Sequence, residues 1–121
     1  MTAQDRPKRE NLTFYPRVFD AKDKKELGSL ADMNLQGMKI FGIRPLPLDK
    51  TYQLRINLPV KMAGNEFMII VARTLWGKED VNPDYWATGF QFTEVSEKNE
   101  RIIRRLIEDY NFVNEYQQEM K

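Results

Sequence analysis

The 121-residue sequence contains neither cysteine nor histidine and only two serines, Ser29 and Ser96. Without cysteine the chain has no disulfide and no thiolate ligand for a metal, which is typical of a reducing compartment. Without histidine it lacks the usual general base and the commonest metal ligand near neutral pH. These absences exclude Ser-His-Asp and Cys-His hydrolases and HExxH metalloproteases, and neither serine lies in a nucleophile-elbow pattern.

Long apolar runs and glycine-rich phosphate loops are also missing. No run approaches the roughly 20 apolar residues that span a bilayer. The polar N-terminus lacks the apolar region of a signal peptide, so we expect a cytoplasmic protein that does not insert into membranes. The six glycines are scattered and form no phosphate loop. Because no acidic pair stands out either, we expect a protein that is not an enzyme and carries no cofactor or metal.

Charged residues are plentiful but balanced. They make up 31% of the chain, while the formal net charge is only +1. Both signs are therefore interspersed over the surface, which argues against a general nucleic-acid-binding protein but allows a local basic site. The length fits one domain that is large enough to bury a core.

Alternation of apolar and polar residues, typical of half-buried strands, runs through much of the chain. Strands are predicted over residues 12–21, 27–31, 38–42, 52–58, 66–76 and 85–92. The alternation is clearest over residues 52–58, and we expect Pro59 to end that strand. Residues 67–72 are apolar on both faces, which predicts a central strand or one covered by a helix. Residues 77–83 are predicted to form a polar loop. Short strands at regular spacing indicate an antiparallel barrel or sandwich.

A single helix is predicted after the last strand. Ser96 is a typical N-cap, and acidic residues follow in the first turn from Glu97. The apolar stripe of this helix consists of Ile103, Leu106, Ile107, Tyr110 and Val113. Such a stripe more often packs on its own domain than on a partner, so we expect it to cover the barrel mouth.

The segment Asp32-Met33-Asn34-Leu35-Gln36-Gly37 is predicted to form a tight polar corner between two strands. Glycine allows a positive φ, and Asp and Asn side chains hydrogen-bond to nearby backbone. On residue types alone, this is a corner in an all-β domain.

This segment also resembles the second signature of the PilZ domain family, [Asp/Asn]-x-Ser-x-x-Gly. The order of strands and turns extends the resemblance from about Arg6 to the C-terminal helix. It implies a mainly β fold, a six-stranded antiparallel PilZ-like barrel with a C-terminal helix. Residues 1–11 would then form a flexible basic arm, and residues 12–121 a single barrel domain whose helix begins at about residue 97.

The ligand implied by the resemblance is cyclic di-GMP, a bacterial second messenger. In the family, an Arg-x-x-x-Arg pair holds phosphate and guanine, and the corner residues bind the guanine edge. The implied ligand-binding residues here are Arg6, Arg9, Asp32, Asn34 and Gly37. The sequence departs from the family pattern in two ways. Asn34 replaces the usual serine, and the two arginines are one residue too close, with Glu10 where the second should fall.

Three functions remain open at this point. The chain could be a cyclic di-GMP receptor that relays binding to a protein partner, or a degenerate PilZ-like adaptor that binds proteins alone. It could also be a small barrel that binds RNA or single-stranded DNA, although no basic face interleaved with aromatics is visible. The receptor is favoured because the corner is largely intact and an arginine-bearing segment precedes the first strand.

Overall fold

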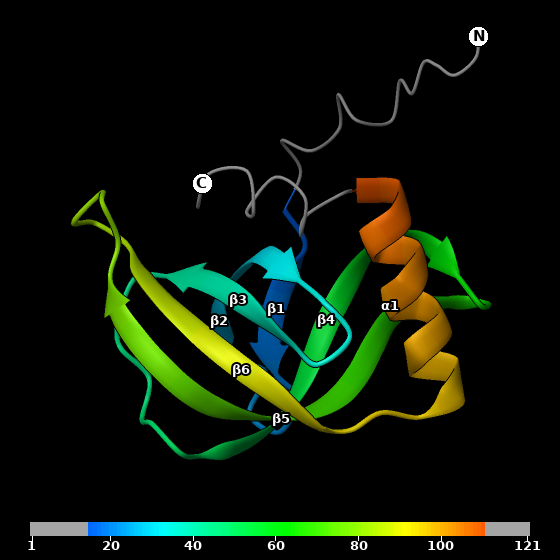
Figure 1. Cartoon of the computed structure of the whole chain (residues 1–121), viewed down its shortest axis with the longest axis horizontal. Coiled ribbons are helices and arrows are strands. Elements are labelled where there is room, and N and C mark those ends of the chain that lie inside the picture. The colour runs from blue at the N-terminus through cyan, green and yellow to red at the C-terminus, as the bar shows by residue number, and fades with distance from the viewer. Residues whose placement is uncertain (1–14, 111–121) are drawn as a thin grey trace, which may run out of the picture.

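The computed structural model describes residues 15–110, which form a closed barrel of strands and one helix (Figure 1). The elements are β1 (Arg17–Asp20), β2 (Glu26–Met33), β3 (Gly37–Gly42), β4 (Thr51–Met62), β5 (Asn65–Glu79), β6 (Trp86–Glu94) and α1 (Glu97–Tyr110). The strand order around the barrel is β1-β2-β3-β6-β5-β4, and β4 pairs with β1 to close it. Every strand pair is antiparallel. The predicted fold class is therefore confirmed.

The core lies inside the barrel and consists of side chains from alternate positions on the strands. In β4, Tyr52, Leu54 and Ile56 are buried, as the alternation predicted, while Leu58 is only half-buried. Strand β4 also contributes Met62, and the remaining strands contribute the buried apolar residues Val18, Leu30, Met33, Met38, Ile40, Met68, Ile70, Ala72, Phe90 and Phe92. Burial of this apolar surface is the main driving force that holds the barrel closed.

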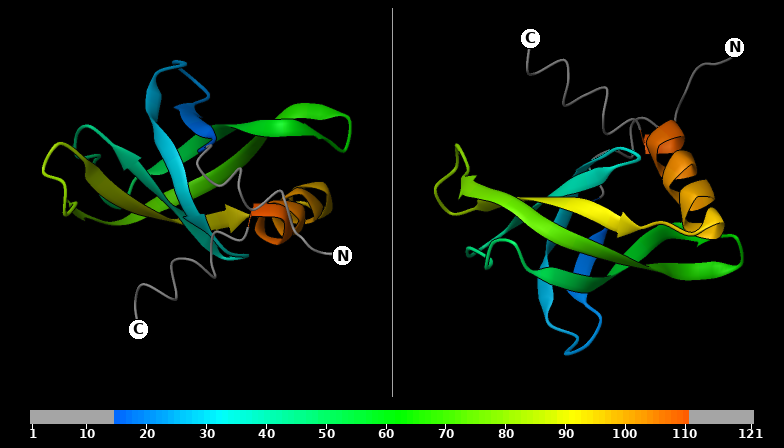
Figure 2. Two further views of the ribbon diagram at one scale, coloured as in Figure 1. Left: turned by 90° about the horizontal axis from the view of Figure 1, so that it is seen from above. Right: turned by 60° about the horizontal axis from the view of Figure 1, so that its bottom comes forward.

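Helix α1 packs against the barrel, which confirms the predicted role of its apolar stripe. Its first turn is capped as expected, because the Ser96 Oγ accepts a hydrogen bond from the Asn99 N–H at 3.0 Å. Ile103 and Leu106 are fully buried, and Ile102, which the predicted stripe left out, is buried too. Figure 2 shows the helix beside the β4–β5 hairpin, and the Asn99 Nδ2 donates to the Ile69 carbonyl at 2.8 Å. The side chain of Tyr110 and residue Val113 lie outside the described part of the chain.

Two predictions about the strands are wrong. Strand β4 continues past Pro59 to Met62, because an irregularity in its pairing with β5 between Asn57 and Met62 accommodates the proline. Strand β5 continues to Glu79, where a loop was expected, because its pairing with β6 extends that far. The prediction that residues 67–72 belong to a central strand is confirmed, because β5 pairs with β4 on one side and β6 on the other, although Phe67 is 41% exposed and Ile69 is 36% exposed.

Within residues 15–110, no helix has both the length and the apolar character needed to cross a membrane.

Candidate ligand-binding site

The side chain of Asn34 builds the corner between β2 and β3. Its Oδ1 accepts hydrogen bonds from the backbone N–H groups of Gln36 at 2.8 Å and Gly37 at 2.9 Å. The Asn34 N–H also donates to the Gly37 carbonyl at 2.9 Å, which closes the turn. These bonds hold the exposed loop in one conformation, as expected for an Asn at such a position. The Nδ2 of Asn34 makes no hydrogen bond to any described residue and is available to a ligand.

Gly37 is required at the corner for a reason that differs from the predicted one. It does not have a positive φ, so the expected backbone conformation is wrong. Instead, a Cβ at this position would overlap the carbonyl oxygen of Phe90 in β6. Glycine is therefore needed because two backbones approach closely here. The corner is also joined to β6 by a hydrogen bond from the Phe92 N–H to the Gln36 carbonyl at 2.8 Å.

Asp32 lies inside β2 and not within the turn itself. The pairing of β2 with β3 shifts register between Leu30 and Asp32, which is the mark of a β-bulge. Bulges change the direction in which neighbouring side chains point. The Asp32 side chain is only 9% exposed, and its Oδ1 accepts from the Met33 N–H at 2.9 Å.

These three residues line one groove of about 320 Å³ on the outer face of the barrel. We call it the corner groove; Asp32, Asn34, Gly37, Lys39, Trp76 and Gln91 contribute to its lining. The corner supplies the first three residues, β3 supplies Lys39, β5 supplies Trp76 and β6 supplies Gln91. The structure thus brings together three of the five predicted site residues. The other two, Arg6 and Arg9, lie outside the described residues.

Trp76 is the main residue of the groove that the sequence did not reveal. It pairs with Gly89 across β5 and β6, and its ring lies on that glycine so closely that a Cβ there would overlap the indole. The indole is 36% exposed and presents apolar surface to the groove. Only the register of the two strands, which is not visible in the sequence, places Trp76 near the corner.

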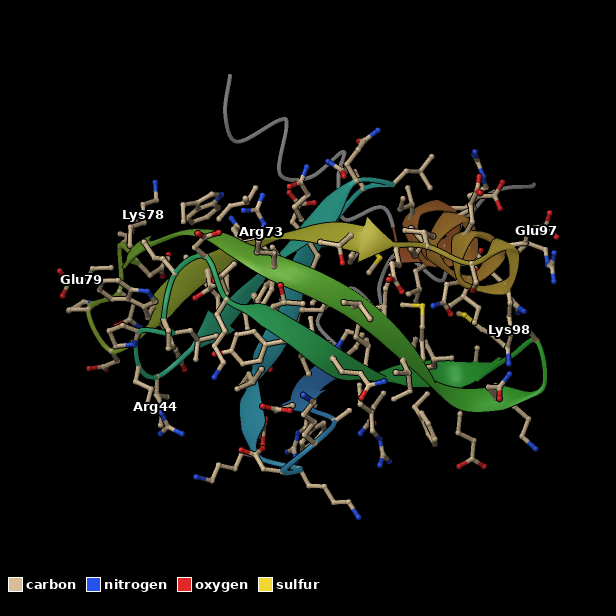
Figure 3. The ribbon with its side chains drawn as sticks, turned by 90° about the horizontal axis from the view of Figure 1, so that it is seen from below. Arg44, Arg73, Lys78, Glu79, Glu97 and Lys98 are labelled. Carbon is tan, nitrogen blue, oxygen red and sulfur yellow. The ribbon has the colours of Figure 1, made fainter. Side chains whose placement is uncertain are left out.

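The groove is framed by charged and polar side chains. Arg73, labelled in Figure 3, projects from β5; its Nη2 donates to the Gln91 Oε1 at 3.3 Å and its Nη1 lies 2.6 Å from the Asp49 Oδ1. Arg73 therefore holds one lining side chain in place. Away from the groove, burial, and then the charges of Asp20 and Asp23, raise the pKa of the Tyr52 hydroxyl. No cluster of acidic side chains within residues 15–110 is arranged to hold a metal ion.

A comparison with protein families matches residues 6–109 to the PilZ domain. The chain belongs to the PilZ domain family. The match covers the barrel, the corner and nearly all of α1, and it includes the segment that carries Arg6 and Arg9. PilZ domains are regulatory binding domains, and the family includes modules that bind cyclic di-GMP.

Solved PilZ structures share this fold. The PilZ domain of YcgR from Escherichia coli, determined with cyclic di-GMP, has a TM-score of 0.57 and 19% identity over 87% of both chains. The Bacillus subtilis inhibitor of motility MotI/DgrA has a TM-score of 0.61 and 12% identity, covering 78% of this chain and 48% of its own.

A longer Escherichia coli YcgR chain in complex with cyclic di-GMP has a TM-score of 0.58 and 20% identity. The match covers 87% of this chain and 44% of YcgR, so this PilZ chain spans less than half of YcgR and of MotI/DgrA. A comparison with curated protein sequences gives no match.

Proposed function

We propose that this PilZ domain is a cyclic di-GMP receptor module that binds the nucleotide in the corner groove and passes the signal to a protein partner. The observation that carries the proposal is the convergence of Asp32, Asn34 and Gly37 on one groove beside Trp76. At about 320 Å³ the groove is at the small end of the range for ligand sites, which suits one guanine with its ribose and phosphate.

Each lining group has a chemical counterpart in the nucleotide. A carboxylate has acceptor sites for several hydrogen bonds, so Asp32 can accept from a guanine N1–H and N2–H₂ edge in addition to the Met33 N–H. The Asn34 Nδ2 is a donor for guanine or phosphate oxygen. The exposed indole face of Trp76 offers a surface on which a base can stack. Lys39 supplies a positive charge for a phosphate.

Arg6 and Arg9 complete the proposed site from the N-terminal side. Arginine binds phosphate or the Hoogsteen edge of guanine with two parallel hydrogen bonds, and its flat face stacks on bases. The shortened spacing means that only one of the two can occupy its expected place, and Glu10 falls where the other is needed. Losing one charged contact costs ~1.5–3 kcal/mol, or roughly tenfold to a hundredfold in affinity.

Calorimetric titration with cyclic di-GMP at one fixed salt concentration tests this proposal, because charge contacts are screened by salt. The parent protein should bind, and Glu10→Arg should strengthen binding by roughly tenfold. Asn34→Ser should give no comparable gain, since the asparagine already forms the turn and keeps a donor.

Two outcomes would change the proposal. If Asn34→Ser gives the larger gain, the corner and not the N-terminal segment limits affinity. If neither the parent nor Glu10→Arg binds at millimolar nucleotide, the receptor function fails. We would then assign the chain an adaptor function, as a PilZ domain that binds only proteins. Glu10 at an arginine position is the observation that favours this function.

A further inference from the structure

A second groove lies on the outer face of β1, β4 and β5, away from the corner. Its volume is about 350 Å³, and its lining includes Phe19, Asp20, Lys24, Arg55, Phe67 and Ile69. We call it the Arg55 groove. A neighbouring hollow of about 400 Å³ shares Arg55 and Phe67 with it and continues along β4 past Val60 and Lys61. The Arg55–Phe67 pair belongs to the lining of both hollows, and we call the two hollows together the track.

Arg55 is held in a defined position by two neighbours. Its guanidinium carbon lies 4.3 Å from the centroid of the Phe67 ring, and its Nε donates to the Asn57 Oδ1 at 3.2 Å. Arg55 forms no ion pair with any residue in the described part of the chain. Its terminal nitrogens therefore remain available as a planar fork, the arrangement that binds a carboxylate with two parallel hydrogen bonds.

Exposed apolar side chains lie near Arg55 on the outer face of the barrel. Phe67 is 41% exposed, Ile69 is 36% exposed, and Val60 on the adjoining strand is 48% exposed. Single exposed apolar residues are ordinary, but a cluster around a pre-positioned cation indicates an interaction surface. The cluster explains why the apolar run of β5 extends over both faces of the strand.

The charges decide which occupant fits. Lys24, Arg55 and Lys61 line the track, against the carboxylates of Asp20 and Glu66. Asp20 already accepts a hydrogen bond from the Lys22 N–H at 2.8 Å, whereas the three cations form no ion pair within residues 15–110. An acidic occupant is therefore favoured over a basic one.

We propose that the Arg55 groove binds an extended segment of a partner protein in which an Asp or Glu stands beside apolar residues. The carboxylate binds the Arg55 fork, and the adjacent apolar side chains pack on Phe67 and Ile69. This site is separate from the corner groove. Ile69 lines the Arg55 groove and Leu75 lines the corner groove, and these two residues lie ~20 Å apart along β5. The proposal holds whether or not the chain binds nucleotide.

The test is an NMR titration of backbone amides in the absence of nucleotide, with two peptides that differ in one group. The first is acetyl-Leu-Val-Asp-Leu-Val-amide, and the second has Asn in place of Asp, which removes the charge and keeps the shape. We expect the Asp peptide to shift the amide signals of Phe67 and Ile69 and to bind roughly tenfold more tightly than the Asn peptide.

Variants of the protein show whether Arg55 causes this preference. Arg55→Gln should bind both peptides equally, and Arg55→Lys should keep only part of the preference, because it retains the charge and loses the fork. Arg44→Gln is the matched control, since Arg44 is an exposed arginine in the β3–β4 loop (Figure 3). It should leave the preference unchanged.

Four results of the titrations would overturn the proposal, and a fifth would come from the protein without peptide. These are no binding of either peptide at millimolar concentration, equal affinity of the parent for both, an unchanged preference in Arg55→Gln, and shifts at the corner groove in place of Phe67 and Ile69. Concentration-dependent shifts at Phe67 without peptide would instead assign the groove to a second copy of the chain, which also contradicts it.

Discussion

The two grooves of this barrel lie along the same strand, β5, but are built in different ways. The corner groove depends on backbone geometry: the turn bonded to Asn34, the close approach at Gly37 and the register that sets Trp76 on Gly89. The Arg55 groove depends on side chains that lie over regular strands, with Arg55 stacked on Phe67. Changes in the corner groove should therefore reduce folding stability as well as binding. Changes in the Arg55 groove should reduce binding with only a small effect on folding stability.

The largest effect on stability is expected for Gly37→Ala. The added Cβ meets the Phe90 carbonyl, and both groups belong to paired backbones that cannot turn away. We expect a loss of about 3 kcal/mol in the free energy of unfolding, at the upper end of overpacking costs, measured by urea denaturation.

Gly89→Ala is the matched control for that variant. Its Cβ meets the Trp76 ring, a side chain that can rotate outward, so the loss of stability should be clearly smaller. Equal losses in the two variants would show that the backbone contact at the corner is not special.

A smaller loss is expected for Asn34→Ala, which removes the acceptor for the Gln36 and Gly37 N–H groups. Each net hydrogen bond contributes about 0.5–1.5 kcal/mol, but water can partly replace these at an exposed turn, so we expect about 1 kcal/mol in all. Asn34→Asp keeps the acceptor and should remain close to the parent in the same denaturation assay. If Asn34→Asp is as unstable as Asn34→Ala, the turn does not depend on this oxygen.

The smallest effect is expected for Arg55→Gln. The side chain is half-buried and unpaired with any carboxylate in residues 15–110, so its removal costs only the contact with Phe67 and the bond to Asn57. We expect a change of about 0.5 kcal/mol in the free energy of unfolding. A loss comparable to that of Gly37→Ala would mean that Arg55 has a structural role, and the contrast between the grooves would fail.

Much of the fold was predictable because it depends on local patterns. The alternation around Leu54 and Ile56 predicts a half-buried strand, and Ser96 before acidic residues predicts the start of a helix. The errors have a common cause in strand pairing. Pro59 is tolerated because a pairing irregularity accommodates it, and β5 continues past Trp76 because its pairing with β6 extends to Glu79.

The candidate site was predictable to the extent that it lies in one short segment. Asp32, Asn34 and Gly37 are close in sequence, and their residue types alone indicate a corner. Trp76 could not be assigned to the same site, because its distance from the corner depends on the registers of β3 with β6 and of β6 with β5. The position of Gly89 opposite an aromatic residue is a usable signal only once that register is known.

The central claim is that cyclic di-GMP binds in the corner groove, and an NMR titration of the parent protein with this nucleotide tests it most directly. We predict shifts in the backbone amides of Asn34, Gly37, Lys39 and Gln91 and in the indole N–H of Trp76, while the amides of Phe67 and Ile69 stay unchanged. Shifts confined to Phe67 and Ile69, or no shifts at millimolar nucleotide, would contradict the account.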